Sequence, residues 1–412
     1  MSVAFKPLTP GATLGVLGGG QLGRMWVHAA QSMGFQTVVL DPDPHSPAGL
    51  VSHQHIQTDY LDPIGLQKMA ATCQAVTTEF ENVPADALAQ LATTLQVAPN
   101  AHAVAVAQDR RLEKSHFVNC GVPVAPFAVI ASDADVEAVL KQADGTSLLP
   151  GILKTARMGY DGKGQVRVRN PQELVDAFKQ LGCVPCVLEK MLPLKAEYSV
   201  IVARGHDGAM VHLPIQHNVH RDGILAMTQV WAGVCDSALE TQAINAAKSI
   251  AQELQYTGVL CVEFFVLEDN ALVVNEIAPR PHNSGHYSLD ACDVSQFELQ
   301  LRCMAGLPLT QPRLHSPAVM LNLLGDIWFG KLGEKLGSDP DLFGTNKSGS
   351  DPNFSPNFPK VLSLPGTHLH LYGKGESRKG RKMGHLTVTA STPEHALAVA
   401  NEATAILGIA AF

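Results

Sequence analysis

A short polar turn between two apolar runs constrains the fold more than any other feature of the sequence. The runs 258–267 and 272–277 consist mainly of Val, Leu, Phe and Ile, and Asp269–Asn270 between them is a favourable two-residue hairpin turn. This turn predicts an antiparallel hairpin in which Leu267 lies opposite Leu272.

The same pairing places two carboxylates, Glu263 and Glu276, opposite each other on one face of the hairpin. Directly opposed residues have Cβ atoms about 4.5–5.5 Å apart, so two carboxylates there repel unless a proton or a metal neutralises them. Oxygen ligands beside a phosphate-binding loop favour Mg²⁺, and Asn275 adds a carbonyl oxygen nearby. A register slip of one residue would place the two carboxylates on opposite faces. We therefore predict Glu263 and Glu276 as metal ligands.

A glycine-rich segment, 159–164, lies between two strand-like runs at 152–156 and 165–169. It is therefore a hairpin loop, which differs from the strand-loop-helix arrangement of a Walker P-loop. Its glycines can turn their amide groups toward a polyphosphate, and Lys154 on the preceding strand can supply a fixed positive charge. An ordinary flexible hairpin is the alternative. The pattern favours a lid over a polyphosphate.

A second glycine loop, Gly18–Gly23, follows a strand and opens a helix, and Asp41 ends the next strand. This arrangement is typical of a dinucleotide-binding domain. The physical requirement is broader, because glycines at a helix N-terminus would hold a phosphate monoester equally well. A tight turn without a ligand is the alternative. The loop thus predicts a phosphorylated ligand, of which NAD is one candidate.

Three segments differ in their patterns of strands and helices. Residues 1–110 alternate strand and helix signals, which predicts a doubly wound parallel sheet. Residues 111–312 combine hairpin-like pairs with helices, which predicts an α+β body with a subdomain at about 122–190. Residues 313–412 form a third, small α+β segment. Within it, 329–359 is rich in Gly, Asp, Asn, Pro and Ser and is expected to be a mobile surface insertion.

Length and charge exclude several classes of protein. A chain of 412 residues predicts two or three domains, and a net charge of −8 gives it no electrostatic reason to bind nucleic acid or an acidic membrane. It contains no apolar run of membrane-spanning length and no signal peptide, so we expect a cytoplasmic protein. The eight cysteines are expected to be reduced and mostly buried. Cys183 and Cys186 have the spacing of half a zinc site or a redox pair, but without a second such pair we favour plain thiols.

Together these motifs resemble the ATP-grasp superfamily and, within it, the N5-carboxyaminoimidazole ribonucleotide synthetase family. The resemblance implies an N-terminal Rossmann-like domain at 1–110, an ATP-grasp domain at 111–312 with its lid at about 122–190, and a C-terminal domain at 313–412. It covers nearly the whole chain and is carried by 18–24, 78–82, 108–110, 159–165, 275–276, 279–286, 372–374 and 380–385.

The resemblance implies an ATP site with Mg²⁺. Arg110 and Lys154 are expected to contact phosphates, Glu197 the ribose, and Glu263 and Glu276 the metal. Glu189 and Lys190 would line the adenine end, and His220 would close on the nucleotide. The full set of expected nucleotide contacts is Arg110, Lys154, Gly159, Tyr160, Asp161, Gly162, Lys163, Gly164, Gln165, Glu189, Lys190, Glu197, His220, Asn275 and Glu276.

The family reaction joins bicarbonate to the amine of 5-aminoimidazole ribonucleotide at the expense of ATP, through carboxyphosphate. The expected catalytic residues are Arg280, His282 and Tyr160 around bicarbonate, together with Lys154. Because Pro281 and Gly285 favour a loop, zinc at His282 and His286 is not favoured. The expected ribonucleotide contacts are Gly20, Gln21, Leu22, Asp41, Glu79, Asn283, Ser284, Lys374, Arg381 and Lys382.

Three alternatives remain open at this point. A formate-dependent glycinamide ribonucleotide transformylase shares the architecture and the first glycine loop. A nicotinamide-dependent oxidoreductase would explain Gly18–Gly23 and Asp41 but leaves the second glycine loop and the paired glutamates without a role. A non-enzymatic carbohydrate- or metal-binding protein is the weakest option. The family also implies a homodimer.

Overall fold

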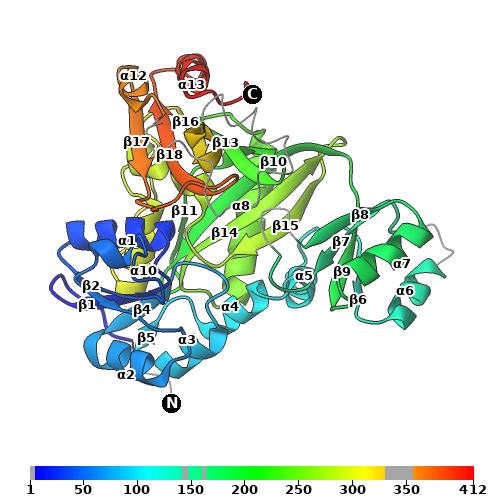
Figure 1. The fold of residues 1–412 in the computed structure, drawn as a ribbon, viewed down its shortest axis with the longest axis horizontal. Helices are drawn as coiled ribbons and strands as arrows, with labels where there is room; N and C mark the ends of the chain where they lie inside the picture. The colour runs from blue at the N-terminus through cyan, green and yellow to red at the C-terminus, as the bar shows by residue number, and fades with distance from the viewer. Residues whose placement is uncertain (1–4, 142–146, 160–163, 330–355) are drawn as a thin grey trace, which may run out of the picture.

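The computed structural model describes residues 5–141, 147–159, 164–329 and 356–412. Its strands form three sheets that are covered by helices, and the chain is arranged in three domains (Figure 1). No helix in these four ranges is long and apolar enough to cross a membrane. Most of the insertion expected at 329–359 lies outside the described residues.

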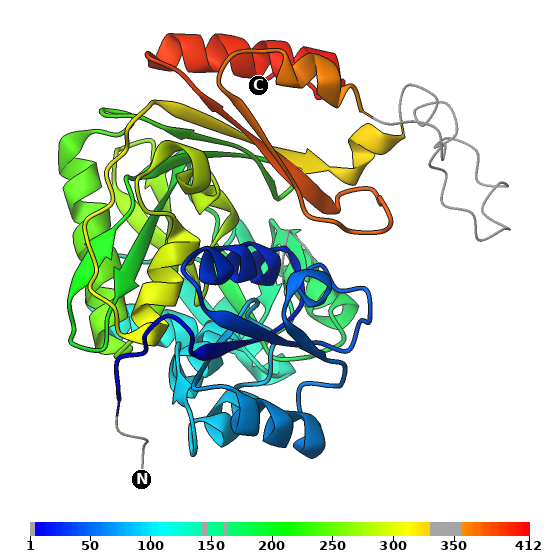
Figure 2. The same ribbon diagram turned by 90° about the vertical axis from the view of Figure 1, so that its left-hand side faces the viewer.

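The N-terminal sheet is parallel and has the order β3-β2-β1-β4-β5, with helices on both faces (Figures 1 and 2). The predicted doubly wound sheet is confirmed. Its strands carry continuous Val, Leu and Ala runs because both of their faces are buried. The elements are β1 (Thr13–Leu17), α1 (Gln21–Ser32), β2 (Gln36–Leu40), β3 (Gln54–Ile56), α2 (Pro63–Thr72), β4 (Ala75–Thr78), α3 (Ala85–Leu91), β5 (Gln96–Val97) and α4 (Ala101–Ala107).

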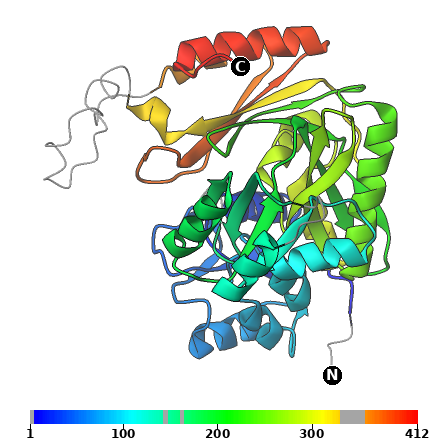
Figure 3. The same ribbon diagram turned by 90° about the vertical axis from the view of Figure 1, so that its right-hand side faces the viewer.

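A small antiparallel sheet of order β6-β9-β7-β8 follows helix α5 (Arg110–Asn119). Two helices cover its outer face, so its inner face looks toward the rest of the molecule (Figures 1 and 3). The predicted pairing of the strands around the glycine-rich loop is confirmed, with Lys154 opposite Gln165. The elements are β6 (Phe127–Ile130), α6 (Asp133–Leu140), β7 (Gly151–Thr155), β8 (Gln165–Val168), α7 (Pro171–Gln180) and β9 (Cys186–Lys190).

The largest sheet has nine strands in the order β15-β14-β10-β12-β13-β16-β18-β17, with β11 beside β10. It runs past residue 313, where the sequence predicted a new domain, because β16 pairs with β13. Helix α13 covers its C-terminal strands (Figure 2). The strands are β10 (Leu194–Arg204), β11 (Met210–His212), β12 (Gln216–Arg221), β13 (Ile224–Val230), β14 (Gly258–Leu267), β15 (Leu272–Ala278), β16 (Ala318–Leu324), β17 (Thr367–Leu371) and β18 (Lys382–Thr389). The helices are α8 (Ser237–Glu253), α9 (Ser288–Ala291), α10 (Gln296–Ala305), α12 (Phe358–Leu362) and α13 (Pro393–Leu407).

The β14–β15 hairpin agrees with the predicted register at only one end. Glu263 lies opposite Glu276, as predicted. The expectation of Leu267 opposite Leu272 is wrong, because Leu272 pairs with Val266 and the register shifts between Glu263 and Phe264. At the turn, the amide of Leu267 donates to the carbonyl of Ala271, and Asn270 is left-handed with φ 65°. The loop is one residue longer than predicted, and a bulge restores the register before the glutamates.

All eight cysteines are free thiols, as expected. Six are buried, Cys120 is half-buried and Cys183 is exposed. Burial raises the pKa of Cys186 to about 11, which keeps this thiol protonated and unreactive at neutral pH. A reactive pair at Cys183 and Cys186 is not supported.

Candidate active site

A cavity of 680 Å³ opens between the small sheet and the large one, a size typical of sites for small ligands. Loops of the N-terminal domain and Lys382 from the C-terminal strands complete its wall. The residues that the sequence predicted and that line it are Arg110, Lys154, Gly159, Gln165, Glu189, Lys190, Glu197, His220, Glu263, Asn275, Glu276, Arg280, His282, Asn283 and Lys382.

Two lysines and a glutamate form a buried ionic group on one wall. Glu189 on β9 lies 3.1 Å from Lys154 Nζ on β7 and 3.2 Å from Lys114 Nζ on α5. Burial lowers the pKa of Lys154, although the carboxylate of Glu189 opposes this effect. For Glu189 burial favours the neutral form, and the two lysines nevertheless hold its pKa below the usual range. Glu189 was expected at the adenine end, and in the structure its carboxylate lies between two cations on the cavity wall.

A second ionic pair joins α5 to β15. Arg110 Nη1 donates to Glu276 Oε2 at 2.9 Å. Burial opposes both charges, yet each partner offsets it, so the pKa of Arg110 is raised and that of Glu276 is lowered. Behind them, Glu113 accepts from the amide of Ile277 at 2.8 Å, and burial raises its pKa to about 7. Glu276 is therefore an anion at neutral pH.

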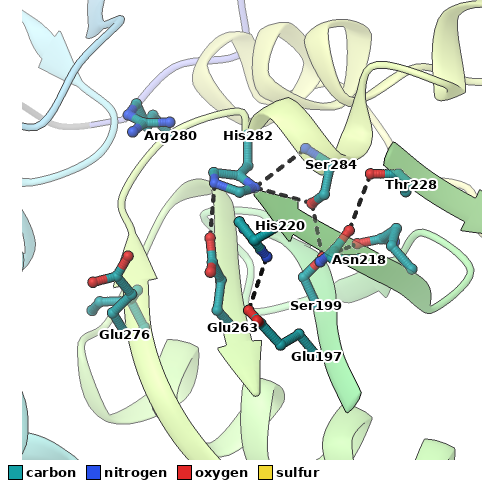
Figure 4. Close-up of polar contacts among 12 residues, drawn as sticks. Glu197, Ser199, Asn218, His220, Thr228, Glu263, Glu276, Arg280, His282 and Ser284 are labelled. Carbon is teal, nitrogen blue, oxygen red and sulfur yellow. Dashed lines mark hydrogen bonds and ion pairs between the residues drawn. The ribbon is translucent and has the colours of Figure 1, made fainter. Parts of the chain in front are cut away.

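The two paired carboxylates each have a basic partner from the chain itself. Glu263 Oε1 lies 2.9 Å from His282 Nε2 (Figure 4), while Glu276 contacts Arg110. The repulsion that predicted a metal is therefore partly relieved by the protein. Asn275 Oδ1 beside them is buried and has no hydrogen-bond partner among the described residues. A set of three oxygen donors, one of them unsatisfied, fits Mg²⁺.

A histidine and a glutamate from neighbouring strands lie together further along the cavity. His220 Nδ1 on β12 lies 2.9 Å from Glu197 Oε2 on β10 (Figure 4). Burial lowers the pKa of His220, but Glu197 outweighs it and raises the pKa overall. The structure thus brings together Glu197, expected at the ribose, and His220, expected to close on the nucleotide.

Arg280 lies on the loop after β15, and its Nε donates to Glu81 of the N-terminal domain. Burial opposes the charge, and Glu81 raises the pKa of Arg280 despite this. Burial likewise opposes the charge of Glu81, whose pKa is lowered by Arg280. Nη1 also donates to the carbonyl of Pro281 at 3.1 Å, so two contacts hold the guanidinium at the wall of the cavity.

Three amides of the first glycine loop donate to carboxylates of the chain. Asp41 accepts from Gly19 at 2.7 Å, and Glu79 accepts from Gly20 at 2.9 Å and from Gly23 at 3.0 Å. Burial raises the pKa of Glu79, but the amides of Gly23 and Gly20 counteract it. The predicted phosphate contact at Gly20 therefore does not fit, because the carboxylates of the chain occupy the helix N-terminus.

Several other expected substrate contacts lie away from the cavity. Leu22 packs in the core of the N-terminal domain. Ser284 is fully buried beneath the loop, which is a correction to its expected contact with substrate. Arg381 donates to the carbonyl of Glu376, and Lys374 donates to the carbonyl of Lys382 at 2.8 Å. Neither Arg381 nor Lys374 lines the cavity.

Some predicted residues are placed without a partner or are not described. Both amide atoms of Asn283 are buried and have no hydrogen-bond partner within the described ranges, at the wall of the cavity. Gly164 has φ 70° and accepts from the amide of Thr155. Tyr160, Asp161, Gly162 and Lys163 lie outside the described residues.

Comparison with known proteins agrees with this arrangement. The domain family described as "ATP-grasp domain" matches residues 115–297, "Ribonucleotide synthetase preATP-grasp domain" matches 11–108, and "Phosphoribosylaminoimidazole carboxylase C-terminal domain" matches 318–399. N5-carboxyaminoimidazole ribonucleotide synthase of Brucella melitensis is 41% identical over 382 residues, which are 92% of this chain and 97% of that protein. The chain belongs to the N5-carboxyaminoimidazole ribonucleotide synthase family. The Bacillus subtilis family member is 39% identical over 92% of this chain and 91% of its own.

Solved structures of this synthase family share the whole fold. An ADP complex of N5-carboxyaminoimidazole ribonucleotide synthetase superposes with a TM-score of 0.84 at 35% identity, covering 98% of this chain and 99% of that one. The Aspergillus clavatus enzyme, solved with ADP and 5-aminoimidazole ribonucleotide, gives a TM-score of 0.83 at 31% identity, covering 97% and 99%.

Three charged residues of the synthase site escaped sequence reasoning as site residues. Lys114 and Glu113 are buried on α5, and Glu81 orients Arg280. For Lys114 and Glu113 the signal was a run of charged residues at the start of a helix, which is also typical of a solvated helix face. For Glu81 it was the segment 78–82, which contributes to the family resemblance.

Proposed function

We propose that this chain catalyses the ATP-dependent carboxylation of 5-aminoimidazole ribonucleotide with bicarbonate, giving N5-carboxyaminoimidazole ribonucleotide, ADP and phosphate. The observation that carries the proposal is a single cavity in which Arg110 and Lys154 face the oxygen donors Glu263, Asn275 and Glu276. The names of the relatives support the substrate, and the relative solved with ADP and 5-aminoimidazole ribonucleotide supports the pairing of these ligands.

In this proposal the nucleotide spans the cavity from the cations to the Glu197–His220 pair. Lys154 and Arg110 neutralise the phosphates, as is usual in phosphoryl transfer, where the protein mainly positions and stabilises charge. Glu197 accepts from ribose hydroxyls. Glu189 keeps Lys154 charged and oriented, since an isolated buried lysine would lose its proton.

Glu263, Glu276 and Asn275 would hold Mg²⁺, which when bound supplies charge neutralisation at the transferring phosphate. The protein's own part is to present these oxygens from adjacent strands. The bulge between Glu263 and Phe264 matters here, because it brings the two glutamates opposite each other.

The proposed reaction proceeds in two steps. A bicarbonate oxygen attacks the γ-phosphorus of ATP, and the bond to the leaving ADP oxygen breaks, giving carboxyphosphate. The amine nitrogen then forms a bond to the carboxyl carbon, the bond from this carbon to the phosphate oxygen breaks, and the departing phosphate takes up the proton that the amine loses. Arg280 would hold the bicarbonate oxygens with the donors that Glu81 leaves open, and exclusion of water protects the mixed anhydride.

The test is a phosphate-release assay on the purified protein with each substrate omitted in turn. We expect rapid release only with ATP, the ribonucleotide and bicarbonate together. Equal rates without the ribonucleotide would contradict the proposal, and activity with formate in place of bicarbonate would support the transformylase alternative instead. The homodimer and the cytoplasmic location stay predictions from the sequence.

A further inference from the structure

A row of buried polar side chains runs beneath the cavity floor, from β13 to the loop that carries His282 (Figure 4). Thr228 Oγ1 donates to Asn218 Oδ1 at 3.0 Å, which fixes the orientation of that amide. Asn218 Nδ2 donates to Ser199 Oγ at 2.9 Å, and Ser199 Oγ lies 2.8 Å from Ser284 Oγ. All four side chains are buried, and the proposed ligand contacts use none of them.

The backbone at the end of this row contributes one donor to the His282 ring. The amide of Ser284 donates to His282 Nδ1 at 3.3 Å. A backbone amide only donates, so this contact favours a lone pair on Nδ1, but at this length it does not fix the tautomer alone and the Ser284 hydroxyl is needed as well. A neutral imidazole with an acceptor at Nδ1 carries its hydrogen on Nε2.

The opposite side of the ring agrees with this assignment. His282 Nε2 lies 2.9 Å from Glu263 Oε1, and a carboxylate can only accept. Ser284 Oγ, 3.0 Å from Nδ1, then donates to the ring and accepts from Ser199. Gln216 Oε1 lies 2.9 Å from Ser199 Oγ and competes for the same hydroxyl proton. Toward Ser199, Asn218 acts only as a donor. The Ser199 hydroxyl therefore gives its one proton either to Ser284 Oγ or to Gln216 Oε1.

We propose that Ser199 and Asn218 are positioning residues that act through Ser284 to hold His282 with its proton on Nε2. The ring then donates to Glu263 and orients this carboxylate for the divalent cation. The role of the cation rests on the proposed function, whereas the protonation of the ring does not. His282 therefore positions Glu263 and does not act as a base, since Nε2 is protonated and two donors face Nδ1.

Nitrogen-15 NMR of the histidine rings in the full chain tests the protonation directly. His282→Gln identifies the signals of His282 by their loss. We expect a protonated Nε2 and an unprotonated Nδ1 at neutral pH, and a mixture of both tautomers in Ser199→Ala. A protonated Nδ1 in the unchanged protein, or an unchanged spectrum in Ser199→Ala, would overturn the proposal.

The dependence of the rate on Mg²⁺ tests the consequence. Groups that orient a metal ligand typically contribute 10–100-fold, so Ser199→Ala should raise the Mg²⁺ concentration for half-maximal rate by about tenfold. The KM for the ribonucleotide should not change. Ser199→Thr retains the hydroxyl and should therefore keep the Mg²⁺ dependence of the unchanged protein. An unchanged Mg²⁺ dependence in Ser199→Ala contradicts the positioning role.

The matched control is Thr387→Val, which removes a buried hydroxyl of the same sheet that has no hydrogen-bond partner among the described residues. An equal shift in this control would show a general packing effect and overturn the inference. If the protein does not carboxylate the ribonucleotide, Mg²⁺-dependent ADP binding replaces the rate as the readout. The proposed function then fails separately from the ring assignment.

Discussion

Lys114 has a fully buried ammonium group at the base of the cavity, between Glu189 and the main chain of β15. Its Nζ donates to the carbonyl of Asn275 at 2.9 Å and lies 3.2 Å from the carboxylate of Glu189. A buried charge of this kind is tolerated only when its partners are in place. Lys114 therefore links the predicted metal-binding strand to the wall that carries Lys154.

Lys114→Met should destabilise the protein by about 3 kcal/mol, because removal of one partner from a buried ion pair leaves the other charge poorly compensated. Urea unfolding at neutral pH measures the change. Lys141→Met is the control, since Lys141 pairs with Glu137 on the exposed surface, and loss of such a pair costs at most about 0.5 kcal/mol. Equal losses in both variants would show that the buried triad contributes no special stability.

Glu276→Gln should reduce kcat at least about 100-fold, because it removes a negatively charged metal ligand worth several kcal/mol of charge stabilisation. The fold should persist, since the amide can still accept from Arg110. Glu268→Gln at the turn of the same hairpin changes the same charge away from the cavity and should leave kcat unchanged. Full activity in Glu276→Gln would show that the metal ligands are misassigned.

At the scale of elements, α10 joins two domains through the buried amide of Gln300. Gln300 Oε1 accepts from the amide of Val259 at the start of β14, and Nε2 donates to Thr77 Oγ1 of β4 and to the carbonyl of Ala98. One side chain thus satisfies backbone groups of both the parallel sheet and the large sheet. It fixes the domain that carries Glu81 relative to the strand that carries Glu263.

Gln300→Leu should cost about 2 kcal/mol or more, because the amide of Val259 and the hydroxyl of Thr77 lose their partners in a dry environment. Thermal unfolding followed by circular dichroism gives the change in stability. The control Gln172→Leu removes an exposed contact with Asp176 and should have little effect. A neutral Gln300→Leu would mean that water replaces the lost hydrogen bonds.

The sequence predicts elements better than their exact pairing. The parallel sheet and both hairpins follow from runs of apolar residues and turn signals, which depend on local chemistry. The β14–β15 turn is longer than predicted because Asn270 adopts a left-handed conformation, and the compensating bulge depends on tertiary contacts of the neighbouring strands. The roles of Lys114 and Glu113 on α5 could not be predicted from the sequence either, because only the folded chain shows which face of this helix is buried.

At the scale of the whole molecule, the cavity collects residues from all three parts of the chain. Glu81 comes from the N-terminal domain, Lys154 from the small sheet, Glu276 from the large sheet and Lys382 from the C-terminal strands. Spacing in the sequence cannot show such a convergence, although the hairpin pairing and the glycine loop did single out Glu276 and Lys154. The first glycine loop shows this limit, because its motif alone does not reveal that Asp41 and Glu79 bind the amides of Gly19 and Gly20.

A histidine cluster where the C-terminal strands meet α9 makes stability depend on pH. Burial is the largest cause that holds the pKa of His385 well below 6.5, and the nearby His286 and His370 lower it further. Tyr372 is hydrogen-bonded to His385 and Asp290 to His370, and His368 Nδ1 lies 3.8 Å from the carboxylate of Asp290. In the unfolded chain the His385 side chain binds a proton near pH 6.5, whereas in the folded protein it stays neutral at that pH. Its stabilising contribution is therefore present above pH 6.5 and is lost as pH falls.

His385→Gln should remove this dependence. Between pH 7.5 and 5.5 the unchanged protein should lose about 1.4 kcal/mol more stability than the variant, one pH unit below the ordinary pKa. Urea unfolding at both pH values measures the difference. An identical pH dependence in the two proteins would show that His385 titrates normally.

The most direct test of the central claim follows the oxygen of bicarbonate. Attack of bicarbonate on ATP leaves one bicarbonate oxygen on the phosphate that is finally released. We therefore predict that bicarbonate labelled with oxygen-18, given with ATP and 5-aminoimidazole ribonucleotide, transfers one labelled oxygen to each phosphate, as measured by mass spectrometry. Phosphate without the label would contradict ATP-dependent activation of bicarbonate in this cavity.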